Sequence, residues 1–125
     1  MRVELVSETE IISTTALLDS GATLSFIPYE IAEILDVIPQ KQTLIDVETA
    51  GGPSRFFPVR LKKLSVFAGG EILSEFVNPA VLVPTDRVND LPYAILGRDL
   101  FFKRFHVTFM EKKKKVILVH HKWAK

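Results

Sequence analysis

The sequence contains no cysteine among its 125 residues, so it can form neither disulfides nor thiolate metal sites. It also lacks an excess of charge. Sixteen Lys and Arg against 15 Asp and Glu leave a net charge of +1, which gives no general attraction for nucleic acid. No apolar run is long enough to cross a bilayer, and the first ten residues lack the apolar core of a signal peptide. These absences predict a cytoplasmic protein that has no contact with membranes.

The chain has the pattern of one mainly β domain, predicted over residues 1–125. With 47% hydrophobic residues it can bury a substantial core. Short apolar segments separated by turn residues favour a compact barrel-like or sandwich-like fold. Glycine pairs at 51–52 and 69–70 indicate hairpin turns. Strands are predicted over residues 2–6, 10–18, 23–27, 43–50, 55–66, 71–83, 93–97, 106–110 and 116–119.

Two short helices interrupt the strands. The first is predicted to begin at Pro28, because proline suits the first position of a helix, and to end before Pro39. Its apolar residues have the spacing of one buried face: Ile31, Ile34, Leu35 and Ile38. A second, brief helix is predicted over residues 98–104.

The most informative stretch is A-L-L-D-S-G-A-T-L-S-F, residues 16–26. A strand that runs into Asp19-Ser20-Gly21 turns sharply and leaves a carboxylate at the corner. Such a turn is common on protein surfaces, since Asp, Ser and Gly are all turn formers. Here apolar residues on both sides place the turn against the core. We therefore expect Asp19 to be partly buried and Gly21 to permit unusual backbone angles or a close backbone approach.

A second motif, A-I-L-G-R-D-L-F at residues 94–101, supports a functional interpretation of the first. Taken together with the Gly-Gly hairpin between them, the two motifs resemble the retroviral-type (retropepsin-like) aspartic proteases, in their cellular and prokaryotic branch. The resemblance covers most of the chain. It implies a mainly β, closed or barrel-like acid-protease fold with one or two short helices, in a single domain that dimerises.

The resemblance also implies a chemistry. Hydrolysis of a peptide bond by two carboxylates requires one to take a proton from water and the other to give one to the substrate. Two adjacent carboxylates cannot both ionise easily, an effect for which the aspartic proteases are themselves the standard example. Because this chain supplies a single Asp-Ser-Gly motif, the second carboxylate is expected from another copy across a two-fold axis. The expected function is that of a homodimeric aspartic endopeptidase acting on extended peptides, without cofactor or metal.

The resemblance assigns a role to each part of the site. Asp19 of each subunit would activate the water, Ser20 would hydrogen-bond across the axis, and Gly21 and Ala22 would pack closely beside the carboxylates. The tip of a mobile flap over the substrate would be formed by Ala50, Gly51 and Gly52. Phe56 and Phe57 would shape apolar subsites or support the flap. The strand beside the active corner and the start of the following helix would be structural: Ile95, Leu96, Gly97, Arg98 and Asp99.

The sequence departs from the viral pattern at one position. Many retroviral enzymes carry, just after the Asp-Thr/Ser-Gly-Ala motif, an acidic residue that pairs with the family arginine. Thr23 occupies that position here. The resemblance therefore does not carry over an ion pair for Arg98.

Two other functions stay open from the sequence. The same fold could serve as a catalytically inactive dimerisation or peptide-binding module. The lysines at 112–115 could instead mark a nucleic-acid-binding β domain, although a solvated turn explains them better. His106, His120 and His121 do not have the spacing of a metal site. Asp86 and Asp90 lie in a polar loop and suit turn or capping roles.

Overall fold

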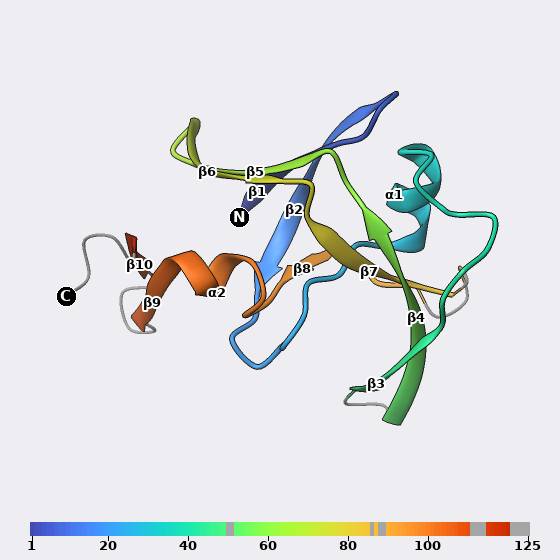
Figure 1. Cartoon of the computed structure of the whole chain (residues 1–125). Helices are drawn as coiled ribbons and strands as arrows, with labels where there is room; N and C mark the ends of the chain where they lie inside the picture. Colours follow the sequence, from blue (N-terminus) through green and yellow to red (C-terminus); the bar gives the residue numbers. More distant parts are fainter. Residues whose placement is uncertain (50–51, 86, 88–89, 111–114, 121–125) are drawn as a thin grey trace.

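The computed structural model describes residues 1–49, 52–85, 87, 90–110 and 115–120, and the last two strands by their backbone alone. The chain is mainly β with two short helices (Figure 1). Its elements are β1 (Arg2–Val6), β2 (Ile11–Leu18), α1 (Tyr29–Ile34), β3 (Ile45–Thr49), β4 (Gly52–Arg60), β5 (Lys63–Ala68), β6 (Glu71–Val77), β7 (Ala80–Pro84), β8 (Ala94–Leu96), α2 (Phe101–Arg104), β9 (Phe105–Met110) and β10 (Lys115–His120).

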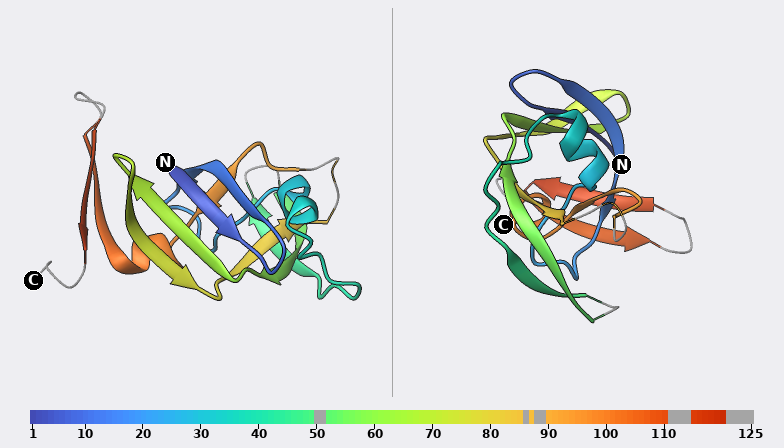
Figure 2. Two further views of the ribbon diagram at one scale, coloured as in Figure 1. Left: turned by 90° about the horizontal axis from the view of Figure 1, so that it is seen from above. Right: turned by 90° about the vertical axis from the view of Figure 1, so that its right-hand side faces the viewer.

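The strands form three sheets. The largest has the order β6-β5-β1-β2-β8, the second β3-β4-β7, and the third consists of β9 and β10. The two larger sheets are packed together with α1 beside them, whereas the β9–β10 hairpin lies at one end of the molecule (Figure 2). Alternating residues of β1 and β5 enclose the core, among them Val3, Leu5, Leu64 and Val66, each at most 1% exposed.

Two predicted long strands are each divided in the structure. The prediction of one strand over residues 55–66 is wrong, because β4 ends at Arg60 and β5 begins at Lys63. Burial alternates through Val59 and Leu61 but resumes at Leu64, so the pattern shifts by one residue at the break. That shift, visible in the sequence, marks the point where the chain leaves one sheet for the other.

The prediction of one strand over residues 71–83 is also wrong. Asn78 adopts a left-handed backbone conformation with φ of 51°, and Pro79 has no N–H to donate, so β6 ends at Val77. The Leu61 N–H donates to the Pro79 oxygen, and the Asn78 N–H donates to the Lys62 oxygen, each at 3.0 Å. These hydrogen bonds join the β4–β5 connection to the β6–β7 connection, and together the two connections form the corner at which the chain passes between the two larger sheets.

Helix α1 is shorter than predicted, but Leu35 is buried and Ile31 and Ile38 pack against the core as predicted. It begins after Pro28, which is the N-cap residue and not the first helical position, and ends at Ile34, with Leu35 as its C-cap before the left-handed Asp36. Ala32 and Leu35 are fully buried, whereas Ile34 is 53% exposed, so its predicted place in the core is wrong. A helix of six residues completes too few turns for the long apolar stripe that the spacing suggested.

The predicted strand over residues 23–27 is absent. Only Phe26 forms β-bridges, to Leu82 on one side and Ile95 on the other. The segment threads between β7 and β8, where the Phe26 N–H donates to the Ile95 oxygen and the Ile27 N–H to the Leu82 oxygen. Of the residues before Phe26, Ser25 accepts the Leu82 N–H on its backbone oxygen at 2.9 Å, and Ala22 and Leu24 place their backbone oxygens close to Gly97.

The last two predicted strands are present as an antiparallel hairpin. β9 and β10 pair from Phe105 opposite His120 to Met110 opposite Lys115. The predicted lysine-rich turn and basic tail lie largely outside the described residues, as do Asp86 and His121. Within the part of the chain that is described, no helix has the length and apolar character needed to span a bilayer.

Candidate active site

Asp19 lies where β2 ends against β8. The two strands pair in parallel, with Leu18 opposite Leu96, and the Asp19 N–H donates to the Leu96 oxygen at 3.0 Å. The ladder therefore continues up to the backbone of Asp19 and fixes its position. Asp19 is partly buried, as its apolar neighbours predicted.

A tight turn follows Asp19. The Gly21 N–H donates to Asp19 Oδ1 at 2.9 Å, and the Ala22 N–H donates to the Asp19 backbone oxygen at 3.1 Å. Gly21 does not have a positive φ, so the unusual backbone angles predicted for it are absent. A β-carbon at this position would instead lie 3.1 Å from Asp19 Oδ1. Glycine thus leaves room for the carboxylate.

Gly97 marks the closest approach between the two motifs. A β-carbon here would lie 2.4 Å from the Leu24 oxygen and 2.6 Å from the Ala22 oxygen, distances that real side chains do not reach. The neighbouring Arg98 N–H donates to the Ala22 oxygen at 2.9 Å. The loop after Asp19 therefore rests directly on the backbone of the Ile95–Gly97 segment, as the resemblance implied for these residues.

Ser25 is a buried residue that joins the same two segments by hydrogen bonds, and sequence analysis missed it. Its side chain is 1% exposed; the hydroxyl donates to Asp99 Oδ1 at 2.6 Å and accepts the Gly97 N–H at 2.9 Å. The contact gives Asp99 the predicted structural role of tying the second motif to the active loop. The available signal was a serine between Leu24 and Phe26, because a polar group in an apolar run needs a buried partner.

We expect Ser25→Ala to lower the free energy of unfolding by about 1–3 kcal/mol, because it leaves the buried Gly97 N–H and one Asp99 oxygen without their partner. Urea denaturation measures the loss. Ser13→Ala is the matched control, since Ser13 is exposed on β2 outside the site and its replacement should change stability little. An equal effect of both substitutions would contradict the role given to Ser25.

Arg98 contacts the position where the viral pattern has an acid. Its Nη2 donates to Thr23 Oγ1 at 3.2 Å, and both residues are exposed. A hydrogen bond from the arginine to an uncharged hydroxyl thus stands where the viral pattern places an ion pair. It ties the start of the second motif to the loop that follows Asp19.

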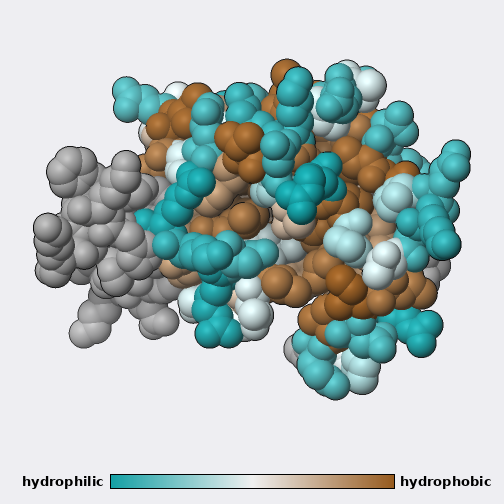
Figure 3. Space-filling model, in the orientation of Figure 1, coloured by the Kyte–Doolittle hydropathy of each residue, from teal (hydrophilic) through white to brown (hydrophobic). Residues whose placement is uncertain are grey.

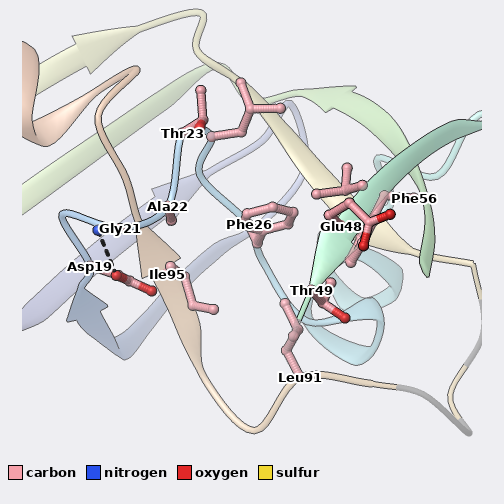
Figure 4. Close-up of a pocket in the computed structure, with 12 residues that line it drawn as sticks. Asp19, Gly21, Ala22, Thr23, Phe26, Glu48, Thr49, Phe56, Leu91 and Ile95 are labelled. Carbon is pink, nitrogen blue, oxygen red and sulfur yellow. Dashed lines mark hydrogen bonds between the residues drawn. The ribbon is translucent and has the colours of Figure 1, made fainter. Parts of the chain in front are cut away.

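A cleft of about 430 Å³ extends from Asp19 to the β3–β4 hairpin. Figure 4 shows Asp19 at one end, with Ile95 and Phe26 between it and the residues of the hairpin. The lining residues that the structure describes are mostly apolar and include two carboxylates and no cation: Asp19, Gly21, Ala22, Thr23, Leu24, Phe26, Val47, Glu48, Thr49, Phe56, Leu91 and Ile95. Apolar surface also reaches the exterior beside the hairpin (Figure 3). Such a cleft suits an extended chain with apolar side chains.

The flap was predicted at the tip of the β3–β4 hairpin. Val47, Glu48 and Thr49 of β3 line the cleft, and the Thr49 hydroxyl donates to the Gly52 oxygen at 2.6 Å across the base of the turn. Ala50 and Gly51 lie outside the described residues, so their predicted place at the tip stays a prediction.

The two phenylalanines of β4 have different surroundings. Phe56 lines the cleft and packs on Phe26, with ring centroids 5.0 Å apart. Phe57 is fully buried in the core, where its ring packs against that of Tyr29. It therefore anchors β4 to the core and does not line the cleft. Among the described residues no cluster of three His, Asp or Glu side chains could hold a metal.

Comparison with known proteins identifies the family. A family model described as aspartyl protease matches residues 8–100, which include Asp19 and the second motif up to Leu100. The chain belongs to the aspartyl protease family. No match was found among curated proteins.

Solved structures show which aspartyl protease fold this is. A retropepsin-like aspartic protease from Rickettsia conorii superposes with a TM-score of 0.65 at 22% identity, over 94% of this chain and 79% of that one. The protease of simian foamy virus gives a TM-score of 0.40 at 21% identity, over 79% of this chain and 89% of the viral one. The chain is thus a retropepsin-like aspartyl protease family member with the mainly β fold that its sequence predicted.

Proposed function

We propose that this protein is a homodimeric aspartic endopeptidase that hydrolyses extended peptides in the cytoplasm, using two Asp19 carboxylates, one from each subunit. The observation that carries the proposal is a carboxylate held by a fixed corner at the end of an apolar cleft, in a chain of the aspartyl protease family. The cleft is open along the flap hairpin and is suited to a peptide and not to a small charged ligand.

The need for a dimer follows from the chemistry. One carboxylate must accept a proton from the attacking water while the other donates one to the substrate carbonyl. The only Asp-Ser-Gly motif of the chain contains Asp19. Among the described residues no other carboxylate lines the cleft near it, since Glu48 belongs to the β3–β4 hairpin. A two-fold axis beside the corner would bring the second Asp19 close. Ser20, exposed next to Asp19, is then available to bond across the axis.

The roles of the remaining residues follow from this arrangement. Gly21 and Ala22 would border the reacting water, and the β3–β4 hairpin with Gly52 at its base would close over the peptide. Ile95, Leu96 and Gly97 hold the corner in place, and Arg98 and Asp99 secure it through Thr23 and Ser25. The site requires neither a cofactor nor a metal for this chemistry.

The β9–β10 hairpin supports a dimer formed at the C-terminal end. In the part of the chain that is described, these strands pair only with each other, and an isolated two-stranded sheet is marginally stable in water. The N-terminal strand β1 offers no free edge for pairing with a second copy, because it pairs with β2 on one side and β5 on the other along its whole length. A second copy packed on the hairpin would cover its edges.

Removal of residues 105–125 is therefore expected to give a folded monomer with no peptidase activity. Sedimentation equilibrium measures the mass, and circular dichroism tests whether the main sheets persist. A control chain that lacks only residues 121–125 retains β9 and β10 and should stay dimeric. A dimer formed by the chain without the hairpin would show that the interface lies elsewhere.

Digestion of carboxymethylated casein between mildly acidic and neutral pH tests the proposed function. Discrete cleavage sites in extended sequences, identified by mass spectrometry, are the expected result. If a dimeric, folded protein binds peptides without cleaving any, it is an inactive peptide-binding module.

A further inference from the structure

The segment between β7 and β8 is fastened to helix α1, which lies outside the cleft. Asp90 accepts the Tyr29 N–H on Oδ1 at 2.6 Å and the Glu30 N–H on Oδ2 at 3.3 Å. Arg87 of the same segment forms an ion pair with Glu33 on the next turn of the helix. Two side chains from one segment thus hold it against a helix about 60 residues earlier in the chain.

The helix lacks a cap of its own. Its N-cap residue is Pro28, which makes no side-chain hydrogen bond to the first turn. The Asp90 carboxylate supplies that missing acceptor and also places a negative charge at the positive end of the helix. The capping role that the sequence predicted for Asp90 is confirmed, with the helix that it caps now known.

The same carboxylate also fixes Leu91. The Leu91 N–H donates to Asp90 Oδ1 at 2.8 Å, so one oxygen joins the start of α1 to the backbone of the next residue. The Leu91 side chain packs against the cluster of Phe26, Phe56 and Leu82. It therefore has a defined place, set by Asp90 behind it and by aromatic rings beside it.

Leu91 lines two cavities. One is the cleft that contains Asp19, and the other is a hollow of about 680 Å³ bordered by β4, Pro84 and Asp90. The two cavities share Thr49, Phe56 and Leu91. Figure 4 shows Leu91 beside Thr49, at the end of the cleft away from Asp19. Its side chain is thus part of the wall that an extended peptide would meet as it leaves the reacting centre.

We propose that Asp90 is a positioning residue for substrate: by anchoring its segment to α1 it holds Leu91 as the cleft wall that selects a large apolar side chain of the peptide. The inference rests on the proposed function and names a specificity determinant for the same site. Asp90 does not touch the peptide. Without its carboxylate three backbone N–H groups lose their acceptor. The exposed Arg87–Glu33 ion pair is then left to join the segment to the helix, and Leu91 loses its fixed position.

The test uses peptide binding, which needs no turnover. The Asp19→Asn chain is titrated with fluorescent octapeptides that carry Leu or Ala at one position at a time, and anisotropy gives the affinities. One position is expected to favour Leu over Ala by roughly tenfold, the discrimination typical of a few methylene groups. Adding Asp90→Ala or Leu91→Ala should abolish the preference for Leu at that position. The affinity for the Ala peptide should stay within about twofold of its value in the Asp19→Asn parent. Asp90→Asn, which keeps an acceptor oxygen, should restore part of it.

Ser7→Ala is the matched control. The Ser7 hydroxyl accepts the Glu10 N–H at 3.1 Å and the Thr9 N–H at 3.4 Å in the β1–β2 turn, away from the cleft. The Ser7→Ala substitution likewise removes the acceptor of backbone N–H groups, and it should leave the Leu preference unchanged. The inference is overturned if the Asp19→Asn parent shows no Leu preference, if Asp90→Ala keeps it, or if Ser7→Ala loses it equally. A wild-type chain that binds with this preference but cleaves nothing would overturn the proposed function alone.

Discussion

Asp19→Asn is expected to lower kcat/KM for casein-derived peptides by about a thousandfold or more while leaving the fold intact. The amide has the volume of the carboxylate and retains an oxygen for the Gly21 N–H, so the turn should persist. It can neither take a proton from water nor share one with the partner's carboxylate, and each such transfer contributes a factor of about 10²–10⁴. Initial rates at several pH values, together with circular dichroism, measure the effect.

Asp36→Asn serves as the control for this substitution. Asp36 is exposed, lies outside the cleft lining, and has a left-handed backbone that asparagine tolerates. Its replacement should leave kcat/KM within about twofold. Equal cleavage by the wild-type and Asp19→Asn chains would point to a contaminant or to a different reacting group.

Gly97→Ala is expected to have the largest effect on stability. A β-carbon would overlap two backbone oxygens, those of Leu24 and Ala22, and the Ala22 oxygen is held in place by the Arg98 N–H. The loop that carries Asp19 would have to separate from the Ile95–Gly97 segment. We expect a loss of about 3 kcal/mol or more in the free energy of unfolding, together with loss of activity. Urea denaturation and casein digestion measure the two effects.

Gly69→Ala separates this steric effect from the general cost of replacing a glycine. Gly69 lies in the β5–β6 turn with φ of 59°, and a β-carbon there would meet nothing within 4 Å. Its replacement should cost about 1 kcal/mol through the backbone conformation alone and should preserve activity. If Gly97→Ala were no more harmful than Gly69→Ala, the close crossing would not be a requirement of the fold.

The family fold and the turn at Asp19 were predictable because short local sequence patterns indicate them. Asp19-Ser20-Gly21 after an apolar strand, the Leu96-Gly97-Arg98-Asp99 motif and the turn at Gly69-Gly70 each need only neighbouring residues to be recognised. The parallel pairing of β2 with β8 brings the two motifs together. The sequence implied this contact through the resemblance, and the structure supplies its register.

The parts that sequence analysis missed depend on contacts between distant residues. Ser25 stands out as a polar residue in an apolar run, but its partner Asp99 lies 74 positions later and cannot be identified from the local sequence. The sheet corner was overlooked because residues 55–66 remain apolar enough for a single strand, although the burial pattern shifts between Leu61 and Leu64. Gly21 was expected to provide backbone freedom, whereas the space beside the Asp19 carboxylate explains it better.

The most direct test of the central claim is activity in mixed dimers. Wild-type and Asp19→Asn chains are unfolded together at a ratio of one to three, refolded, and assayed for casein cleavage per wild-type chain. If each active site needs two Asp19 residues, only dimers of two wild-type chains act, and activity per wild-type chain should fall to about a quarter. Unchanged activity per wild-type chain would mean that one subunit is sufficient, and it would contradict a site shared across a two-fold axis.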